Sequence, residues 1–210
     1  MTNHVASCAL VALLAAAGSG CSDDPIDSDE EARRAYLGLD GSIEKSLNLG
    51  FDGFNAASSA NIDPQATVGD AAGALVVTGQ VDQGSSANKE MRLRVGMTDY
   101  SDGIFVVVIE DGEDDLELEV DLSYDTAATV EDQPYLHLSL RDVPDGTFTG
   151  ELTGVYLLDG DIEGEVELDL AMTGEIEDGG GGLVVRVPGT TTVTGTATSG
   201  DGLYAVDVTL

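Results

Sequence analysis

The chain is poor in cysteine, in basic residues and in aromatic residues. Its 210 residues include two cysteines, two histidines, eight lysines and arginines in total, and no tryptophan. Both cysteines precede Ser22, so the chain beyond that point has neither a disulfide nor a thiol nucleophile. One histidine remains there, His137, and a single histidine without cysteine cannot build the usual zinc site. These absences exclude a disulfide scaffold and a conventional zinc centre from the folded domain.

Acidic residues dominate the charge. Forty Asp and Glu residues give a net charge of −32, and none of them precedes Asp23. Such an excess repels nucleic acid and anionic membrane surfaces, so strong binding to either is not expected. It favours solubility, divalent cations and basic partners. The simplest interpretation is a solvated acidic surface, as is common in proteins from salty habitats.

One stretch near the start, Val5–Ala17, is uncharged and consists mostly of Ala, Leu and Val. As a helix it would rise about 20 Å, too short for a membrane core of about 30 Å. Small residues follow it, which is typical of a secretion signal. Cleavage is expected either after Ala17, by an ordinary signal peptidase, or before Cys21.

In this first tenth, the chain resembles Gram-negative bacterial lipoproteins, because an apolar run and small residues lead to Cys21. The resemblance implies that residues 1–20 are removed as a signal peptide and that the Cys21 thiol receives a diacylglycerol anchor. The chain departs from the usual pattern in having Gly18 where Leu is common, and no Lys or Arg near the start. In such lipoproteins Asp after the cysteine often signals inner-membrane retention; Ser22 here favours the outer membrane, facing the periplasm or the cell surface. The alternative is a plain secreted protein in which Cys21 is an incidental thiol.

The residues after Cys21 divide into three parts. Residues 21–27 are a short acidic tether. Residues 28–72 are expected to form a helix and a surface connection packed on the main body. Ser28 and Glu31 form a capping-box pattern at the helix start. Apolar residues at spacings of four and three then predict one amphipathic helix ending near Gly50, with this stripe: Ala32, Tyr36, Leu39, Ile43 and Leu47.

Residues 73–210 alternate between apolar and polar residues, which predicts an all-β domain of antiparallel strands with one core-facing side. Asp-Gly pairs between the runs supply the positive φ of tight hairpins. The result is a meander of about nine or ten strands forming a sandwich or a barrel. Two continuously apolar runs, Ile104–Ile109 and Leu183–Val185, predict central strands covered on both faces. The predicted strands are Gly73–Val81, Glu90–Thr98, Ile104–Glu110, Leu116–Ser123, Tyr135–Arg141, Thr147–Leu158, Ile162–Met172, Leu183–Val187, Thr190–Thr198 and Leu203–Leu210.

A weak calcium candidate occurs between two predicted strands. Asp159, Asp161 and Glu163 stand at positions one, three and five of a loop with Gly at position six, as in a calcium-binding loop. Position twelve is Leu170 instead of Glu, and strand alternation explains Glu163 equally well. A looser alternative is that several acidic turns, among them Glu110–Asp115, gather at one end and hold calcium weakly.

Catalytic signatures are lacking. No Gly-x-Ser-x-Gly elbow occurs, and no pair of the forty carboxylates stands out as a glycosidase pair. We expect His137 to share a solvated strand face with Tyr135 and Arg141. We expect Arg92, Arg94 and Arg141 to form cross-strand ion pairs. The sequence therefore predicts no catalytic residues and no cofactor.

These observations favour an exported, lipid-anchored cell-envelope protein with a non-enzymatic structural or interaction β domain. Its partners would be the membrane, through the lipid, and an envelope protein, with divalent cations as a further candidate and no nucleic acid. The alternative is a carrier of an apolar ligand, because a helix with a closing meander is similar in outline to lipocalins and to periplasmic lipoprotein carriers. The interior distinguishes the two: a packed core favours an interaction module, and a dry cavity favours a carrier.

Overall fold

The computed structural model describes residues 26–111 and 114–210. The signal peptide, Cys21 and the tether up to residue 25 therefore lie outside the described residues. The helices are α1 (Asp29–Leu37) and α2 (Asp40–Ala56), with a 3-10 turn at Val130–Asp132. The strands are β1 (Gln65–Val68), β2 (Ala72–Val81), β3 (Lys89–Ser101), β4 (Phe105–Asp111), β5 (Asp114–Val120), β6 (Leu122–Asp125), β7 (Tyr135–Arg141), β8 (Gly146–Gly160), β9 (Gly164–Gly180), β10 (Leu183–Arg186), β11 (Thr192–Ser199) and β12 (Gly202–Thr209).

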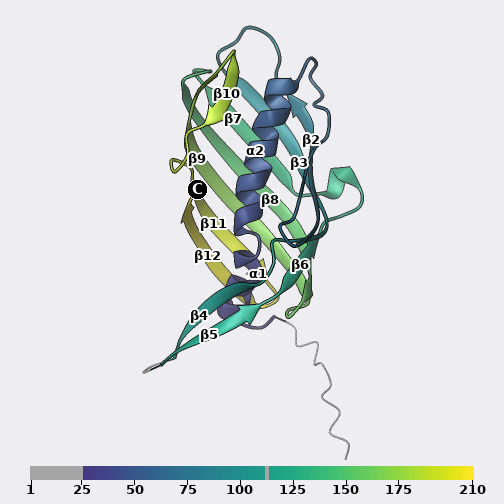
Figure 1. Ribbon diagram of the computed structural model, residues 1–210, viewed down its shortest axis with the longest axis vertical. Coiled ribbons are helices and arrows are strands. Elements are labelled where there is room, and N and C mark those ends of the chain that lie inside the picture. Colours follow the sequence, from purple (N-terminus) through teal and green to yellow (C-terminus); the bar gives the residue numbers. More distant parts are fainter. Residues whose placement is uncertain (1–25, 112–113) are drawn as a thin grey trace, which may run out of the picture.

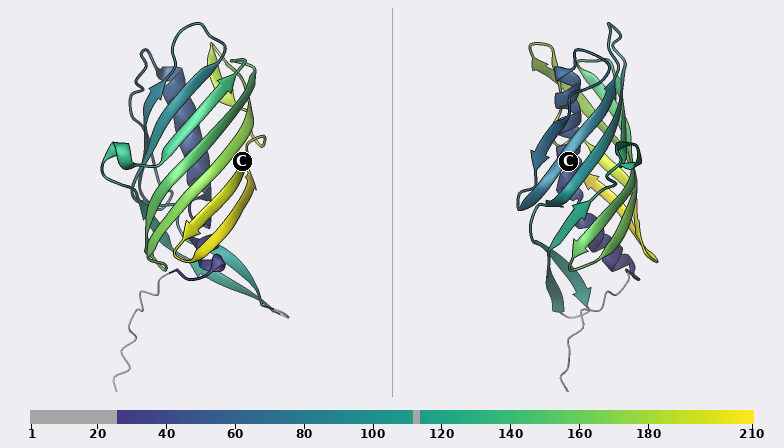
Figure 2. Two further views of the ribbon diagram at one scale, coloured as in Figure 1. Left: turned by 180° about the vertical axis from the view of Figure 1, so that it is seen from behind. Right: turned by 90° about the vertical axis from the view of Figure 1, so that its right-hand side faces the viewer.

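Ten of these strands form one antiparallel sheet that curves around the helices (Figures 1 and 2). The order is β1-β2-β3-β6-β8-β9-β11-β12, with β7 also lying between β3 and β8, and β10 paired with β9. Helix α2 runs along the concave face, and α1 packs near β12. The all-β class with antiparallel strands is confirmed. The sequence left a sandwich or a barrel open, whereas the structure has a single curved sheet whose second layer is helical.

The alternating sequence pattern determines which side of the sheet is buried. Along β9 every second residue is buried and the residues between are exposed. The buried set includes Val166, Leu168, Leu170 and Met172, and each points toward the helical side. Each apolar side chain of this size stabilises the fold by about 1.5–3 kcal/mol when buried. The predicted strand at Tyr135–Arg141 agrees with the structure residue for residue.

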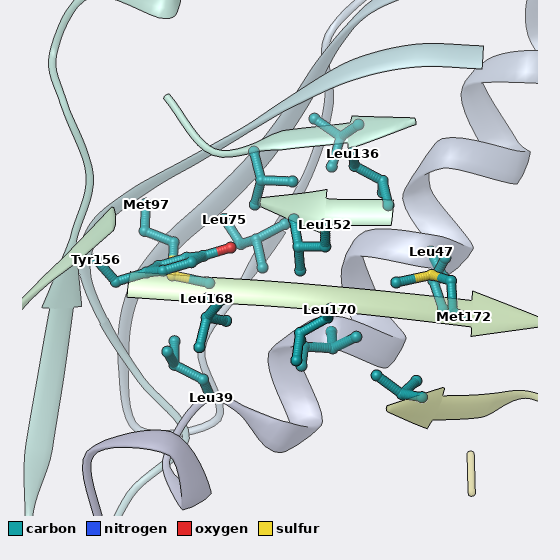
Figure 3. Packing of buried hydrophobic residues seen from close by; sticks show 14 of the residues in the cluster. Leu39, Leu47, Leu75, Met97, Leu136, Leu152, Tyr156, Leu168, Leu170 and Met172 are labelled. Carbon is teal, nitrogen blue, oxygen red and sulfur yellow. The ribbon is translucent and has the colours of Figure 1, made fainter. Parts of the chain in front are cut away.

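The core lies between α2 and the concave face. The predicted apolar stripe of the helices is buried, with Leu39 and Leu47 fully enclosed. Figure 3 shows these two leucines packed with Leu168, Leu170 and Met172 of β9. One continuous cluster therefore joins both helices to most of the large sheet.

The single helix predicted from Ser28 to Gly50 is wrong in two respects. The helix is interrupted at Gly38 and Leu39, so that α1 and α2 are separate. Helix α2 also continues past Gly50 to Ala56, because the glycine lies inside the packed region instead of ending the helix. A Cβ at Gly50 would lie 2.8 Å from Leu93 Cδ1, so this glycine allows α2 to approach β3 closely. The predicted surface connection also contains a strand that was not expected there, β1.

The two continuously apolar runs do not form central strands, which corrects that prediction. Strand β4 pairs with β5 in a separate hairpin that projects from the body (Figure 1). Its inner face is covered, with Val107 and Val120 buried, while Ile104 and Val106 are 64% and 55% exposed. The other run forms β10, a four-residue strand with an exposed Leu183. Periodicity alone cannot separate a strand buried on both faces from a short hairpin with an apolar outer face.

Candidate functional site

Three polar side chains on the convex face of the sheet contact one carboxylate, that of Glu90 on β3. Glu90 Oε2 accepts hydrogen bonds from Ser139 Oγ and lies 3.0 Å from His137 Nε2, and Oε1 accepts from Arg141 Nη2 at 3.0 Å. These partners come from β7, the neighbouring strand, in register. Partial burial opposes charge on Glu90, but the hydrogen bonds from Ser139 and Arg141 outweigh it and hold the pKa of Glu90 below its usual value.

This cluster contains a serine, a histidine and a carboxylate, but their order is not that of a nucleophilic triad. In a triad, the base contacts the nucleophile and the acid orients the base. Here both Ser139 and His137 contact the same oxygen of Glu90. The serine hydroxyl therefore donates its hydrogen bond to the Glu90 carboxylate and not to the imidazole of His137. The arrangement supports cross-strand pairing and gives no activated serine.

A shallow groove of about 310 Å³ runs beside the cluster, over β7, β8 and β9. Short hydroxyl side chains form its floor. Ser139 of β7 pairs with Thr149 of β8, and Thr149 pairs with Thr173 of β9. His137 and Glu151, another cross-strand pair, border it. Hydroxyl groups on a convex surface point away from one another, so few of them could contact the same ligand in this groove.

The predicted ion pairs are confirmed for two of the three arginines. Arg141 pairs with Glu90, and Arg92 Nη2 lies 2.9 Å from Asp82 Oδ1. Arg94 differs: its Nη1 donates to Gln133 O at 2.7 Å, and its guanidinium lies 4.8 Å from the ring centre of Tyr135. As predicted, His137 lies on the same strand face as Tyr135. The two rings also stack, with their centres 6.1 Å apart.

The three residues of the calcium candidate do not come together in the structure as a cluster of metal ligands. Among the residues whose side chains the structure describes, 26–109 and 116–210, no three His, Cys, Asp or Glu side chains gather in a way that could hold a metal ion, and Asp159, Asp161 and Glu163 are within that range. The turn after β8 instead directs Asp161 Oδ2 to the backbone N–H of Asp121, 2.8 Å away. The side chains of Glu110–Asp115, in the looser alternative, lie outside the described ones.

A second cleft, of about 240 Å³, lies between α2 and β10 and is lined by Phe51, Val184 and Pro188 among others. Arg186 closes one side of it, with a side chain only 6% exposed. Its three guanidinium nitrogens donate to Asn48 Oδ1, Thr191 Oγ1 and Glu44 Oε1. Burial lowers the pKa of Arg186, and Glu44 opposes that effect. Each guanidinium nitrogen therefore has a hydrogen-bond partner, and two of the three partners, Asn48 and Glu44, join β10 to α2.

The contacts that join the helices to the sheet could not be found by sequence reasoning. Asn55 of α2 holds Val184 of β10 through two hydrogen bonds, although 129 positions separate them. Arg186 and Glu44 are 142 positions apart. No spacing signal exists for partners so distant, because only the folded chain brings them together.

Within the described residues, no helix is both long and apolar enough to cross a membrane. No protein-family model matches the chain, and neither a curated protein nor a solved structure matches it.

Proposed function

We propose that the chain is an exported lipoprotein of the cell envelope whose β domain acts by contact with a partner or as a structural module. One observation carries this proposal: an uncharged run, Val5–Ala17, is followed by small residues and then by Cys21. With Ser22 next to the cysteine, the outer membrane is the expected location.

The position of Ile26 is compatible with anchoring. Ile26 is buried at one end of the molecule, and its carbonyl accepts a hydrogen bond from Asp201 N at 3.2 Å. Four residues lie between Cys21 and Ile26, so the five Cα–Cα steps that join them span at most about 18 Å. The folded domain of an anchored protein would thus be held close to the membrane surface.

The filled interior supports an interaction or structural module over a carrier. Helix α2 occupies the concave side of the sheet, where a lipocalin-like protein would hold its ligand. Leu39, Leu47 and Phe51 are all buried there against the sheet. The Glu90 cluster, with its serine hydrogen-bonded to the carboxylate, supports a non-enzymatic role.

The test is the intact mass of the protein purified from the envelope of its own host. We expect a chain that begins at Cys21 and carries acyl groups. Cys21→Ser should abolish acylation and release the protein from the membrane fraction. Cys8→Ser is the matched control, because this cysteine lies within the signal and should leave acylation unchanged. A mature chain that begins at Gly18 without acyl groups would refute the proposal.

A further inference from the structure

The β4–β5 hairpin exposes more large apolar side chains than any other pair of neighbouring strands in the described part of the chain. Val106, Val108 and Leu116 are exposed, as is Ile104 just before β4. The hairpin projects from the body, and within residues 26–111 and 114–210 its two strands pair only with each other (Figures 1 and 2). A two-stranded ribbon has little stability of its own, and apolar groups gathered on a projecting element mark a contact surface.

The two faces of β5 differ in chemistry. Glu117 and Glu119 lie on the outer face of the hairpin, where Glu117 is opposite Val108 of β4. Both glutamates are exposed, and neither has an ion-pair partner among the side chains that the structure describes. Leu116 and Leu118 lie on the other face, the first exposed and the second half-buried. Strand β5 therefore presents carboxylates on one face and leucines on the other.

The edge of β5 that points away from β4 has free backbone groups. Asp121, directly after β5, bonds on that side to the turn after β8: its N–H donates to Asp161 Oδ2 at 2.8 Å, and its carbonyl accepts from Asp161 N at 3.0 Å. Backbone groups of alternate residues point to the same side of a strand, so those of Glu119 and Glu117 share this direction. Within residues 26–111 and 114–210, no backbone hydrogen bond to another strand or turn uses them.

The opposite edge of the hairpin is partly covered. Arg33 of α1 lies 3.5 Å, through Nη1, from the Val108 carbonyl of β4. Glu30 pairs with the same guanidinium nitrogen at 3.1 Å, so this arginine already has an acidic partner. The edge of the hairpin that stays open is therefore that of β5.

A strand added at this edge would meet two kinds of neighbour. Successive side chains of such a strand alternate between the two faces. On one face they would lie beside the carboxylates of Glu117 and Glu119, and on the other beside Leu116 and Leu118. Because cross-strand neighbours of opposite charge attract and apolar neighbours pack, the edge favours a strand in which Lys or Arg alternates with apolar residues.

Charge argues against two other occupants of this edge. The sixteen residues of Phe105–Val120 include seven acidic residues and no basic ones. A second copy paired at the same edge would place these carboxylates against their own kind, which is unfavourable. A lipid surface would have to strip water from Glu117 and Glu119, because they share a face with the exposed valines. A basic extended segment avoids both penalties.

We propose that β5 is a docking edge for an extended basic segment of a partner protein, in which Lys or Arg alternates with apolar residues. The added strand extends the hairpin to three strands, which stabilises a ribbon that is marginal with two. This docking function rests on the contact role proposed above and is independent of the lipid at Cys21. Failure to bind a basic segment would therefore leave the expected mass of the mature chain unchanged.

The full chain carrying Cys21→Ser tests this docking function with a short blocked peptide of alternating lysine and valine. Hydrogen exchange at the Glu117 and Glu119 amides should slow as the peptide is added, and added salt should weaken the effect. A peptide of alternating lysine and serine has the same charge and should bind at least about fivefold more weakly, because it lacks apolar side chains for the leucine face. Unchanged exchange at both amides, or equal affinity for the two peptides, would overturn the proposal. Slower exchange with zwitterionic vesicles but not with the peptide would also overturn it, in favour of a lipid surface.

Two charge reversals give a matched comparison. Glu117→Lys places a positive charge at the docking edge and should raise the dissociation constant of the lysine–valine peptide at least about fivefold. Glu167→Lys changes the net charge equally, at a glutamate of β9 that is also opposite a valine, Val155, but on a strand paired on both sides. It should leave the constant within about twofold of that of the parent chain. Both glutamates are exposed, so both variants are expected to fold. Equal effects of the two reversals would show attraction to the overall charge and refute docking at β5.

Discussion

Lys45 Nζ lies 2.6 Å from Asp102 Oδ1, and this contact joins the middle of α2 to the loop after β3. The two side chains are 27% and 23% exposed. Asp102 also accepts hydrogen bonds from the Tyr100 hydroxyl at 2.7 Å and from Asp70 N at 3.0 Å. Three segments of the chain therefore meet at one carboxylate. Lys45 has a second acidic neighbour, Asp70, whose side chain is 75% exposed.

Asp102→Asn should lower the free energy of unfolding by about 1–2 kcal/mol, because a partly buried lysine loses its best partner and Tyr100 its charged acceptor. Asp70→Asn is the matched control and should change it by less than about 0.5 kcal/mol, since exposed ion pairs contribute little. Urea unfolding of both variants measures the difference. Equal effects would contradict the central role of Asp102.

The contribution of Asp102 should depend on pH. Burial opposes its charge, but hydrogen bonds from Lys45 and Tyr100 outweigh that and lower its pKa in the folded protein. A folded-state pKa below the unfolded value stabilises the fold above the unfolded pKa, and the stabilisation is lost as the pH falls through the folded pKa. The stability difference between the parent chain and Asp102→Asn should therefore be full at neutral pH and shrink below about pH 4. A difference that persists at lower pH would contradict this assignment.

Asn55→Ala should loosen β10. The Asn55 amide donates to Val184 O at 2.8 Å and accepts from Val184 N at 2.9 Å, as a neighbouring strand would. Its loss should cost about 1–3 kcal/mol and speed hydrogen exchange at the Val184 amide. Asn48→Ala, which removes one exposed contact to Arg186, should leave that amide protected. Unchanged exchange in Asn55→Ala would show that β9 alone holds β10.

Gly38→Ala should destabilise the fold although the backbone there is ordinary, with φ at −69°. An added Cβ would lie 2.2 Å from the hydroxyl of the buried Tyr124, which donates to Ala35 O. Displacing this ring should cost about 1–3 kcal/mol. At Gly41 the nearest atom is Asp102 Oδ2, 3.2 Å away, so Gly41→Ala should stay within about 1 kcal/mol of the parent chain. Thermal unfolding of the two variants gives the comparison, and equal melting temperatures would contradict it.

The sequence by itself determined the class of fold and the buried face of strands with clear alternation, such as β7 and β9. Strict alternation, as in β9, requires one solvated side and one buried side. The apolar stripe from Tyr36 to Leu47 likewise identified the helical surface that packs on the sheet. These features depend on local periodicity, which one chain displays without reference to its partners. The predicted lipidation of Cys21 has the same local basis and stays a prediction.

Only the tertiary structure decided which elements cover those buried faces. A single sheet can bury its inner side against a second sheet, against itself or against helices, and the strand pattern is the same in each case. Here the choice depends on close approaches such as Gly50 to Leu93, and on distant pairs such as Lys45 with Asp102. The same limit explains the error over Ile104–Ile109: an apolar residue shows its preference for burial, but whether another element covers it depends on where the rest of the chain folds.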